Sequence, residues 1–148
     1  MSVPTEYDFA VLEIGDGEAS EVFVVSCGKQ DFTVNFAAQT QDRFVRDCAK
    51  PGEIPFRKTK ASGKMLDITA SGLVDDDAVR NEADLIGTVQ NVRLRYYRED
   101  GTDLGELLAT ISCPMRINTL SIGTPREGDS TAEMSLASHG EWTFVTAP

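Results

Sequence analysis

The chain has 148 residues, and 41% of them are apolar, which fits one globular domain over 1–148 and excludes a disordered chain. Its net charge of −10 disfavours a protein that grips nucleic acid, because such proteins need cations to displace phosphate counterions. No apolar run approaches the roughly 20 residues of a membrane span, so we expect no membrane insertion. The N-terminus lacks the basic and apolar regions of a secretory signal, and we expect folding in the cytoplasm.

Apolar and polar residues alternate along most of the chain, and this period of two is typical of half-buried β-strands. The first expected strands cover 7–14 and 22–26, and a third contains Phe32, Val34 and Phe36. Similar alternation follows at 66–71, 91–96, 109–118 and 131–136, and Trp142 and Phe144 indicate a last strand. The sequence therefore predicts a mainly β fold.

Residues 39–63 lack this alternation and contain two prolines. We expect a long inter-strand loop here, and such loops are usually functional or disordered. A basic loop with apolar anchors on an acidic body suits docking on another copy of the chain. The same features fit a solvated loop equally well. Eight cations lie in the loop or at its flanks: Lys29, Arg43, Arg46, Lys50, Arg57, Lys58, Lys60 and Lys64.

One segment, 75–86, has the pattern of a short helix. Three aspartates open it and Gly87 closes it, as the helix dipole and helix stop signals require. Asp75 can cap the helix, and Ala78, Leu85 and Ile86 share the face expected to pack on the sheet. Calcium binding is the alternative for the acidic triplet, but the spacing of the common calcium loop is absent, which favours capping.

Turn chemistry marks the remaining breaks between strands. Asp100-Gly101 predicts a hairpin, and Gly-containing turns at 15–17 and 127–129 predict two further reversals. Pro114 lies inside the run 107–122, where proline cannot donate a ladder hydrogen bond. This position indicates an edge, a bulge or a change of pairing partner.

The residues of enzymes and metal sites are sparse. The chain has no Gly-rich phosphate loop, no C-x-x-C pair and a single histidine, His139, in a turn. We therefore expect no catalytic residue, no metal and no cofactor. Cys27 and Cys113 occur in apolar, strand-like contexts and are expected in the core. Cys48 lies in the polar loop, as an exposed thiol or an inter-subunit bridge.

The order of these elements resembles the phage major tail protein, or tail tube, family from the second strand to the C-terminus. The segments that carry the resemblance are Lys64-Met65-Leu66-Asp67-Ile68-Thr69-Ala70-Ser71-Gly72-Leu73, the helix from Asp75, the turn 100–105, the strand from Ala109, and the closing stretch 132–144 with its Leu-x-x-x-Gly pattern. The charged loop with Cys48 departs from the family pattern.

The resemblance implies a β-sandwich or barrel with one short flanking α-helix and a long inter-strand loop. It further implies a non-enzymatic subunit whose six copies form a ring, with the inner sheets joined into a barrel. Stacked rings would form a tube in the virion tail, assembled in the host cytoplasm. DNA would pass through its lumen without specific binding. The implied partners are other copies, the tip or baseplate, the terminator and, in a contractile tail, the sheath.

Two sets of site residues follow from the resemblance. Ring-to-ring contact is assigned to the long loop, with Arg43, Phe44, Arg46, Cys48, Phe56, Arg57 and Lys58. The lumen is assigned to polar strand positions, with Asn35, Asp67, Thr69 and Glu133. Two other functions fit the sequence: the tube ring of a contractile secretion system or gene transfer particle, and a free-standing β-sandwich binding module that stays monomeric.

Overall fold

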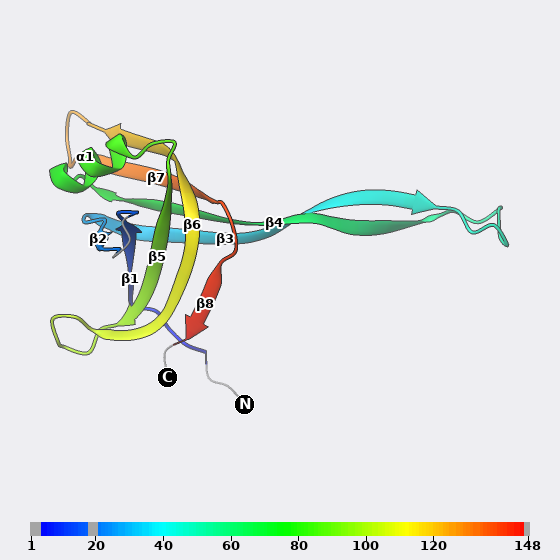
Figure 1. Cartoon of the computed structure of the whole chain (residues 1–148), viewed down its shortest axis with the longest axis horizontal. Helices are drawn as coiled ribbons and strands as arrows, with labels where there is room; N and C mark the ends of the chain where they lie inside the picture. Colours follow the sequence, from blue (N-terminus) through cyan, green and yellow to red (C-terminus); the bar gives the residue numbers. More distant parts are fainter. Residues whose placement is uncertain (1–3, 18–20, 147–148) are drawn as a thin grey trace.

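The computed structural model describes residues 4–17 and 21–146 (Figure 1). The expectation about an N-terminal signal falls in part on residues 1–3, which lie outside the described residues. No helix in the described ranges is long and apolar enough to cross a membrane. The elements are β1 (Phe9–Gly15), β2 (Phe23–Val25), β3 (Lys29–Val45), β4 (Phe56–Leu73), α1 (Asp76–Asp84), β5 (Val89–Arg98), β6 (Glu106–Gly123), β7 (Thr131–Ser138) and β8 (Thr143–Thr146).

The strands form a single antiparallel sheet in the order β2-β1-β5-β6-β7-β4-β3, with β8 paired to β6. The first part of β6 pairs with β5 on one edge and with β8 on the other, and its last part, from Met115 to Gly123, pairs with β7. In Figure 1, β1 and β5 run across the direction of β3, β4 and β7. Through β6 the sheet therefore folds over on itself into two layers. The expected mainly β class with one short helix is confirmed.

One apolar core lies between the two layers. It combines side chains of β1, β5 and the start of β6 with side chains of β4, β7 and the end of β6. Each fully buried side chain of this kind contributes about 1.5–3 kcal/mol, so the core holds the layers together. Its buried members are Leu12, Ile14, Leu66, Ile68, Ala70, Val92, Leu94, Ile111, Cys113, Met115, Ile117, Met134 and Leu136.

Pro114 lies where β6 changes its pairing partner. On one edge, pairing with β8 ends at Ser112 and pairing with β7 begins at Met115. A proline at this junction removes no ladder hydrogen bond on that edge. Its carbonyl accepts a hydrogen bond of 2.8 Å from the backbone N–H of His139, which leads from β7 toward β8. Of the three predicted alternatives for Pro114, the structure shows the change of pairing partner.

The predicted hairpin at Asp100-Gly101 is also confirmed, because residues 99–105 connect β5 to β6. The Asp100 carboxylate accepts hydrogen bonds from the hydroxyl and the backbone N–H of Thr102. These bonds stabilise the charged form and hold the pKa of the Asp100 carboxyl below its ordinary value. Gly101 has a φ of +82°, which a side chain would disfavour.

Helix α1 begins where the sequence predicts, with the Asp75 carboxylate accepting a hydrogen bond of 3.2 Å from the backbone N–H of Ala78. The capping interpretation is confirmed. The helix ends at Asp84, two residues before the predicted end. The prediction that Ile86 packs on the sheet is wrong: this side chain is 41% exposed, because the chain has already left the helix and turns at Gly87.

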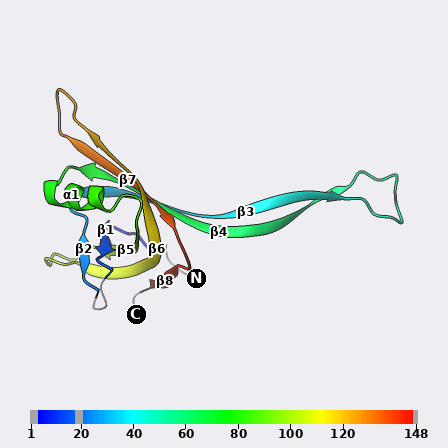
Figure 2. The ribbon, with the colours of Figure 1, turned by 45° about the horizontal axis from the view of Figure 1, so that its top comes forward.

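The prediction that residues 39–63 form a loop is wrong for most of the segment. Strands β3 and β4 continue through it and pair from Gln39–Gly63 to Val45–Phe56, so that residues 46–55 form the connection. This hairpin extends far from the body (Figures 1 and 2). Alternation is absent because neither face of the hairpin is buried, whereas the backbone ladder needs no particular side chains.

Two cysteine predictions have different outcomes. Cys113 is buried in the core as expected, whereas Cys27 is exposed, so its assignment to the core is wrong. Cys27 follows the three-residue strand β2 at the sheet edge, where the apolar neighbours that suggested burial are themselves partly exposed. Cys48 is exposed in the connection between β3 and β4.

A buried ion pair joins the start of β3 to α1. The Lys29 ammonium lies 3.2 Å from the Glu82 carboxylate, and their side chains are 0% and 2% exposed. The Ser26 hydroxyl donates a second hydrogen bond to the same carboxylate. Lys29 is therefore part of the body, and its grouping with the cations of the predicted loop is wrong.

We expect Lys29→Met to lower the free energy of unfolding by about 3–5 kcal/mol, because the change leaves the Glu82 carboxylate buried without its cation. Urea denaturation followed by circular dichroism measures the loss. The double variant Lys29→Met/Glu82→Leu removes both charges and is expected to regain most of the stability. Equal losses in the single and double variants would contradict this account of the pair.

Candidate assembly surfaces

Nearly every residue of the outer hairpin, residues 39–63, here called the arm, is exposed. The arm carries six cations and three acids, a net charge of +3. Since the whole chain has a net charge of −10, the residues outside the arm carry a net charge of −13. The apolar side chains of the arm are uncovered: Phe44 is 66% exposed, Ile54 88% and Phe56 82%. Exposed apolar groups together with a net charge opposite to that of the body are typical of a contact surface.

The tip of the arm is held by its own hydrogen bonds. The Arg46 guanidinium donates to the carbonyl oxygens of Pro51 and Glu53 at 2.6 and 3.1 Å. The Asp47 carboxylate accepts a hydrogen bond of 2.9 Å from the backbone N–H of Ala49. These bonds close the connection between β3 and β4, so the arm ends in a defined turn.

The structure brings together all seven residues that the sequence assigned to ring-to-ring contact, and all are exposed. Arg43 pairs with Lys58 across the hairpin, and Phe44 pairs with Arg57. Because directly opposite residues of an antiparallel pair point to the same side, Arg43 and Lys58 share one face of the arm. The arm therefore presents cations on both of its faces.

An aromatic cluster lies where the arm leaves the body. The Phe36 ring lies 5.5 Å from the Trp142 ring and 6.2 Å from the Phe144 ring, measured between centroids. Phe36 and Phe144 remain 43% and 47% exposed. Sequence alternation had indicated strands at these residues but not their contact, since β3 and β8 are not paired in the sheet.

The four residues that the sequence assigned to the lumen lie on one face of the β3-β4-β7 sheet. Asn35 is directly opposite Asp67, Thr69 is two positions further along β4, and Glu133 is opposite Ser71. This face is turned away from the core, because the intervening residues of β4 and β7 belong to the apolar cluster. The four side chains thus share a surface, while its role as a channel lining stays a prediction.

The neighbouring positions on this face are also short and mostly polar. Following the registers across β3, β4, β7 and β6 gives three rows: Asn35-Asp67-Ala137-Arg116, Thr33-Thr69-Ser135-Thr119 and Asp31-Ser71-Glu133-Ser121. The Arg116 guanidinium donates a hydrogen bond to the carbonyl of Gly87, which draws this cation toward the chain after α1. The face therefore carries three carboxylates and one engaged guanidinium.

Two edges of this half-sheet are open among the described strands. Strand β3 is the last in the order and pairs on one side, with β4. The end of β6, residues 118–123, pairs with β7 on one side, while pairing with β5 stops at Arg116. Unpaired N–H and C=O groups along such edges are templates for pairing with another chain.

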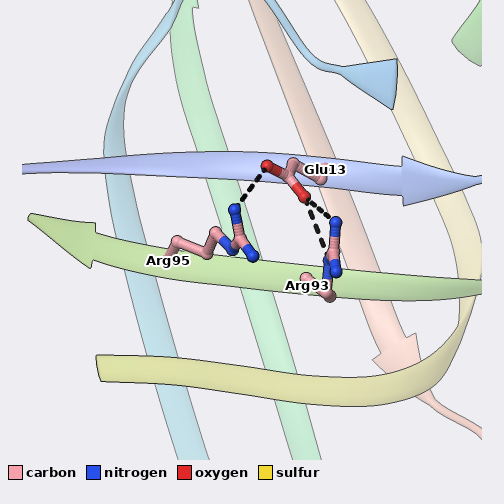
Figure 3. A network of polar contacts seen from close by, with 3 residues as sticks. All are labelled: Glu13, Arg93 and Arg95. Atoms are coloured by element: carbon pink, nitrogen blue, oxygen red, sulfur yellow. Dashed lines mark hydrogen bonds and ion pairs between the residues drawn. The ribbon is translucent and has the colours of Figure 1, made fainter. Parts of the chain in front are cut away.

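A polar network connects strands of the second layer, which contains β1, β2 and β5. The Glu13 carboxylate on β1 accepts hydrogen bonds from Arg93 on β5 at 3.0 and 2.5 Å and from Arg95 at 3.5 Å (Figure 3). The Arg93 guanidinium also lies 3.7 Å from the centre of the Phe23 ring on β2, within the range of cation–π attraction. The network links β2, β1 and β5, whose pairing no local sequence pattern indicated.

Within residues 4–17 and 21–146, no group of three or more histidine, cysteine or acidic side chains is arranged to hold a metal ion. The side chains gathered on the arm and the polar face are those of contact surfaces, with charges, short polar groups and exposed rings.

Solved structures share this fold, whereas no protein-family model and no curated protein sequence matches the chain. The tail of an empty gene transfer agent particle, computed with C6 symmetry, aligns at a TM-score of 0.63 and 18% identity over 91% of this chain and 94% of that one. The sheath-tube complex of the extracellular contractile injection system PVC aligns at a TM-score of 0.66 and 12% identity, over 99% and 95%. The SPP1 tail tube aligns at 0.61 and 10% identity, over 97% and 80%.

These likenesses cover nearly the whole chain at identities below one in five. The predicted resemblance to tail tube proteins is therefore confirmed at the level of the fold: the chain has the fold found in the tail tube of a phage, the tail of a gene transfer agent and the sheath-tube complex of a contractile injection system.

Proposed function

We propose that the chain is the structural, non-enzymatic subunit of a phage-type tail tube. Six copies form a ring, and stacked rings form a hollow conduit through which DNA is delivered to the host. The observation that carries this proposal is the half-sheet of β3, β4, β7 and the end of β6, which has a polar free face and two open edges.

If the two open edges of neighbouring copies join, the unpaired backbone N–H and C=O groups of both edges gain hydrogen-bond partners. The four strands alternate in direction, since each neighbouring pair is antiparallel. Rotation about a ring axis keeps strand direction along that axis, so β3 of one copy meets the end of β6 of the next copy with opposite direction. The antiparallel pattern then continues across every subunit boundary, and closure leaves no open edge in the wall.

The ring size is taken from the likeness to the gene transfer agent tail, which was computed with C6 symmetry. Six copies of the four strands would give a barrel of 24 strands. The core covers the opposite face of the half-sheet, so the polar face is the one free to line the channel. Short polar side chains and carboxylates on that face would repel phosphate and prevent DNA from sticking.

In this assembly the arm connects one ring to the next. Its length supports this role: the strands of the arm extend for about 20 Å beyond residue 39, at roughly 3.3 Å per residue, before the tip begins. Its cations complement the acidic body of another copy. Its uncovered aromatic rings can make apolar contacts there. The further partners are the tail tip or baseplate, the terminator and, in a contractile particle, the sheath. The subunit would assemble in the host cytoplasm and remain in the virion tail.

The tube of a contractile injection system is the second candidate function. The observation that favours it is the alignment with the PVC sheath-tube complex over 99% of this chain. Both candidates share the ring, the channel and the arm contact, so the experiments below test the common assembly.

We expect the purified protein to form rings and hollow tubes, seen by negative-stain electron microscopy after concentration at low salt. The triple variant Arg43→Glu/Arg57→Glu/Lys58→Glu is expected to keep rings but lose tubes, because like charges then face each other between rings. Asp103→Lys, a charge reversal in the β5–β6 turn, is the control and is expected to form tubes. A monomer under every condition, also with added tail-tip extract, would contradict the tube.

The lining of the channel can be tested with thiols. In a background with Cys27→Ser and Cys48→Ser, we expect Thr69→Cys in tubes to react with a small maleimide but resist one coupled to a large polymer. Val145→Cys on β8, which is 61% exposed in the layer opposite, is the control and is expected to react with both. Equal labelling of the two variants by the large reagent would contradict a lumenal position for Thr69.

A further inference from the structure

Two uncovered apolar surfaces lie at opposite ends of the molecule's long axis. One is the arm tip, with Ile54 and Phe56. The other is the edge strand β2, where Val24 is 51% exposed and Val25 42%. Figures 1 and 2 share the same horizontal axis and place β2 and α1 at the end opposite the arm tip. Apolar groups gathered on a surface in this way indicate contacts with another molecule.

The apolar surface at β2 is one wall of a groove. The groove, of about 360 Å³, runs between β2 and α1 and is lined by Val24, Val25 and Cys27 on one side and by Asp75, Asp77 and Asn81 on the other. It combines an apolar wall with an acidic wall. The arm has the complementary composition next to its tip, because Phe56, the first residue of β4, is followed directly by Arg57 and Lys58.

The groove is held open by contacts on both of its sides. The backbone N–H of Ser26 donates to the carbonyl of Leu12 at 2.8 Å, and the Ser26 hydroxyl donates to Glu82 of α1. Arg93 lies over the ring of Phe23 on β2. These contacts fix β2 against β1 and α1, so the groove is preformed and loses less conformational entropy when it binds a ligand.

We propose that the β2–α1 groove of one copy binds the arm tip of a second copy. The inference rests on the proposed tube, because stacked rings give each arm a copy in the next ring. The charges favour this occupant: the arm carries +3 and the rest of the chain −13. Since groove and arm tip lie at opposite ends, the contact is head-to-tail, does not close on itself and gives every stack one polarity.

The aromatic cluster at the base of the arm is a weaker acceptor. The hollow beside Trp142 is lined by Glu141 and also by Lys64. The Lys64 cation would repel the basic arm and offset the attraction of the Glu141 carboxylate. Among the described residues that line the β2–α1 groove, Asp75 and Asp77 are acidic and none is a cation. Charge complementarity therefore selects the groove.

The native cysteines provide a direct test, because Cys27 lines the groove and Cys48 lies at the arm tip, both exposed. Within one chain they are separated by the 17 residues of β3, roughly 50 Å of strand. A short bis-maleimide can therefore join Cys27 to Cys48 only between copies. The third thiol, Cys113, is buried, and burial raises its pKa, which keeps it unreactive.

We expect cross-linked tubes to give a ladder of dimers, trimers and longer chains on a denaturing gel, with a Cys27–Cys48 peptide conjugate found by mass spectrometry. Cys27→Ser and Cys48→Ser are each expected to abolish the ladder. Tubes that yield no Cys27–Cys48 conjugate would overturn the docking.

A charge exchange provides the second test. Asp77→Lys alone and Arg57→Glu/Lys58→Glu alone are each expected to lose tubes, whereas an equal mixture of the two proteins regains them, because each reversed arm then meets a reversed groove. Asp103→Lys again serves as the control. Tubes formed by Asp77→Lys as by the native protein, or a mixture that stays unassembled, would overturn the docking. Native protein that forms neither rings nor tubes would instead contradict the proposed function itself, so the two failures differ.

Discussion

The structure depends on one constraint: the backbone groups of every strand must find partners. Strand β6 meets this constraint twice, because it belongs to both layers and pairs with β5, β8 and β7 along its length. The fold of the sheet at β6 buries one apolar core between the layers. It also moves the end of β6 beyond the reach of β5, which leaves a second open edge opposite β3. The same strand that closes the core thus leaves the sheet with a free edge.

Each surface of the molecule would have a different role in the proposed assembly. The open edges would join copies side by side, the polar face of β3, β4 and β7 would line the channel, and the arm would bind the next ring. Charge supports the division, because the basic arm and the acidic body carry opposite net charge. A subunit of this kind gains its remaining backbone and apolar contacts from copies of itself, which ties stability to assembly.

Much of the fold could be predicted from the sequence, because its signals are local. Alternation indicated the strands of the body, Asp75 and Gly87 indicated the helix, and Pro114 indicated an irregularity in its strand. The arm strands could not be recognised, since a hairpin exposed on both faces needs no alternation. The Lys29–Glu82 pair joins residues 53 positions apart, so no local pattern shows it. For the candidate sites, alternation sufficed to group the polar face, whereas the β2–α1 groove arises from contacts between distant segments.

The most direct test of this account is amide hydrogen exchange of the protein before and after assembly. The account predicts that the outer edge of β3 in the body and residues 118–123 of β6 gain protection together on assembly, since these edges pair with each other across the subunit boundary. Strand β7, which is already paired on both sides, should change little. Assembled particles in which neither open edge gains protection would contradict the account, because another surface would then join the copies.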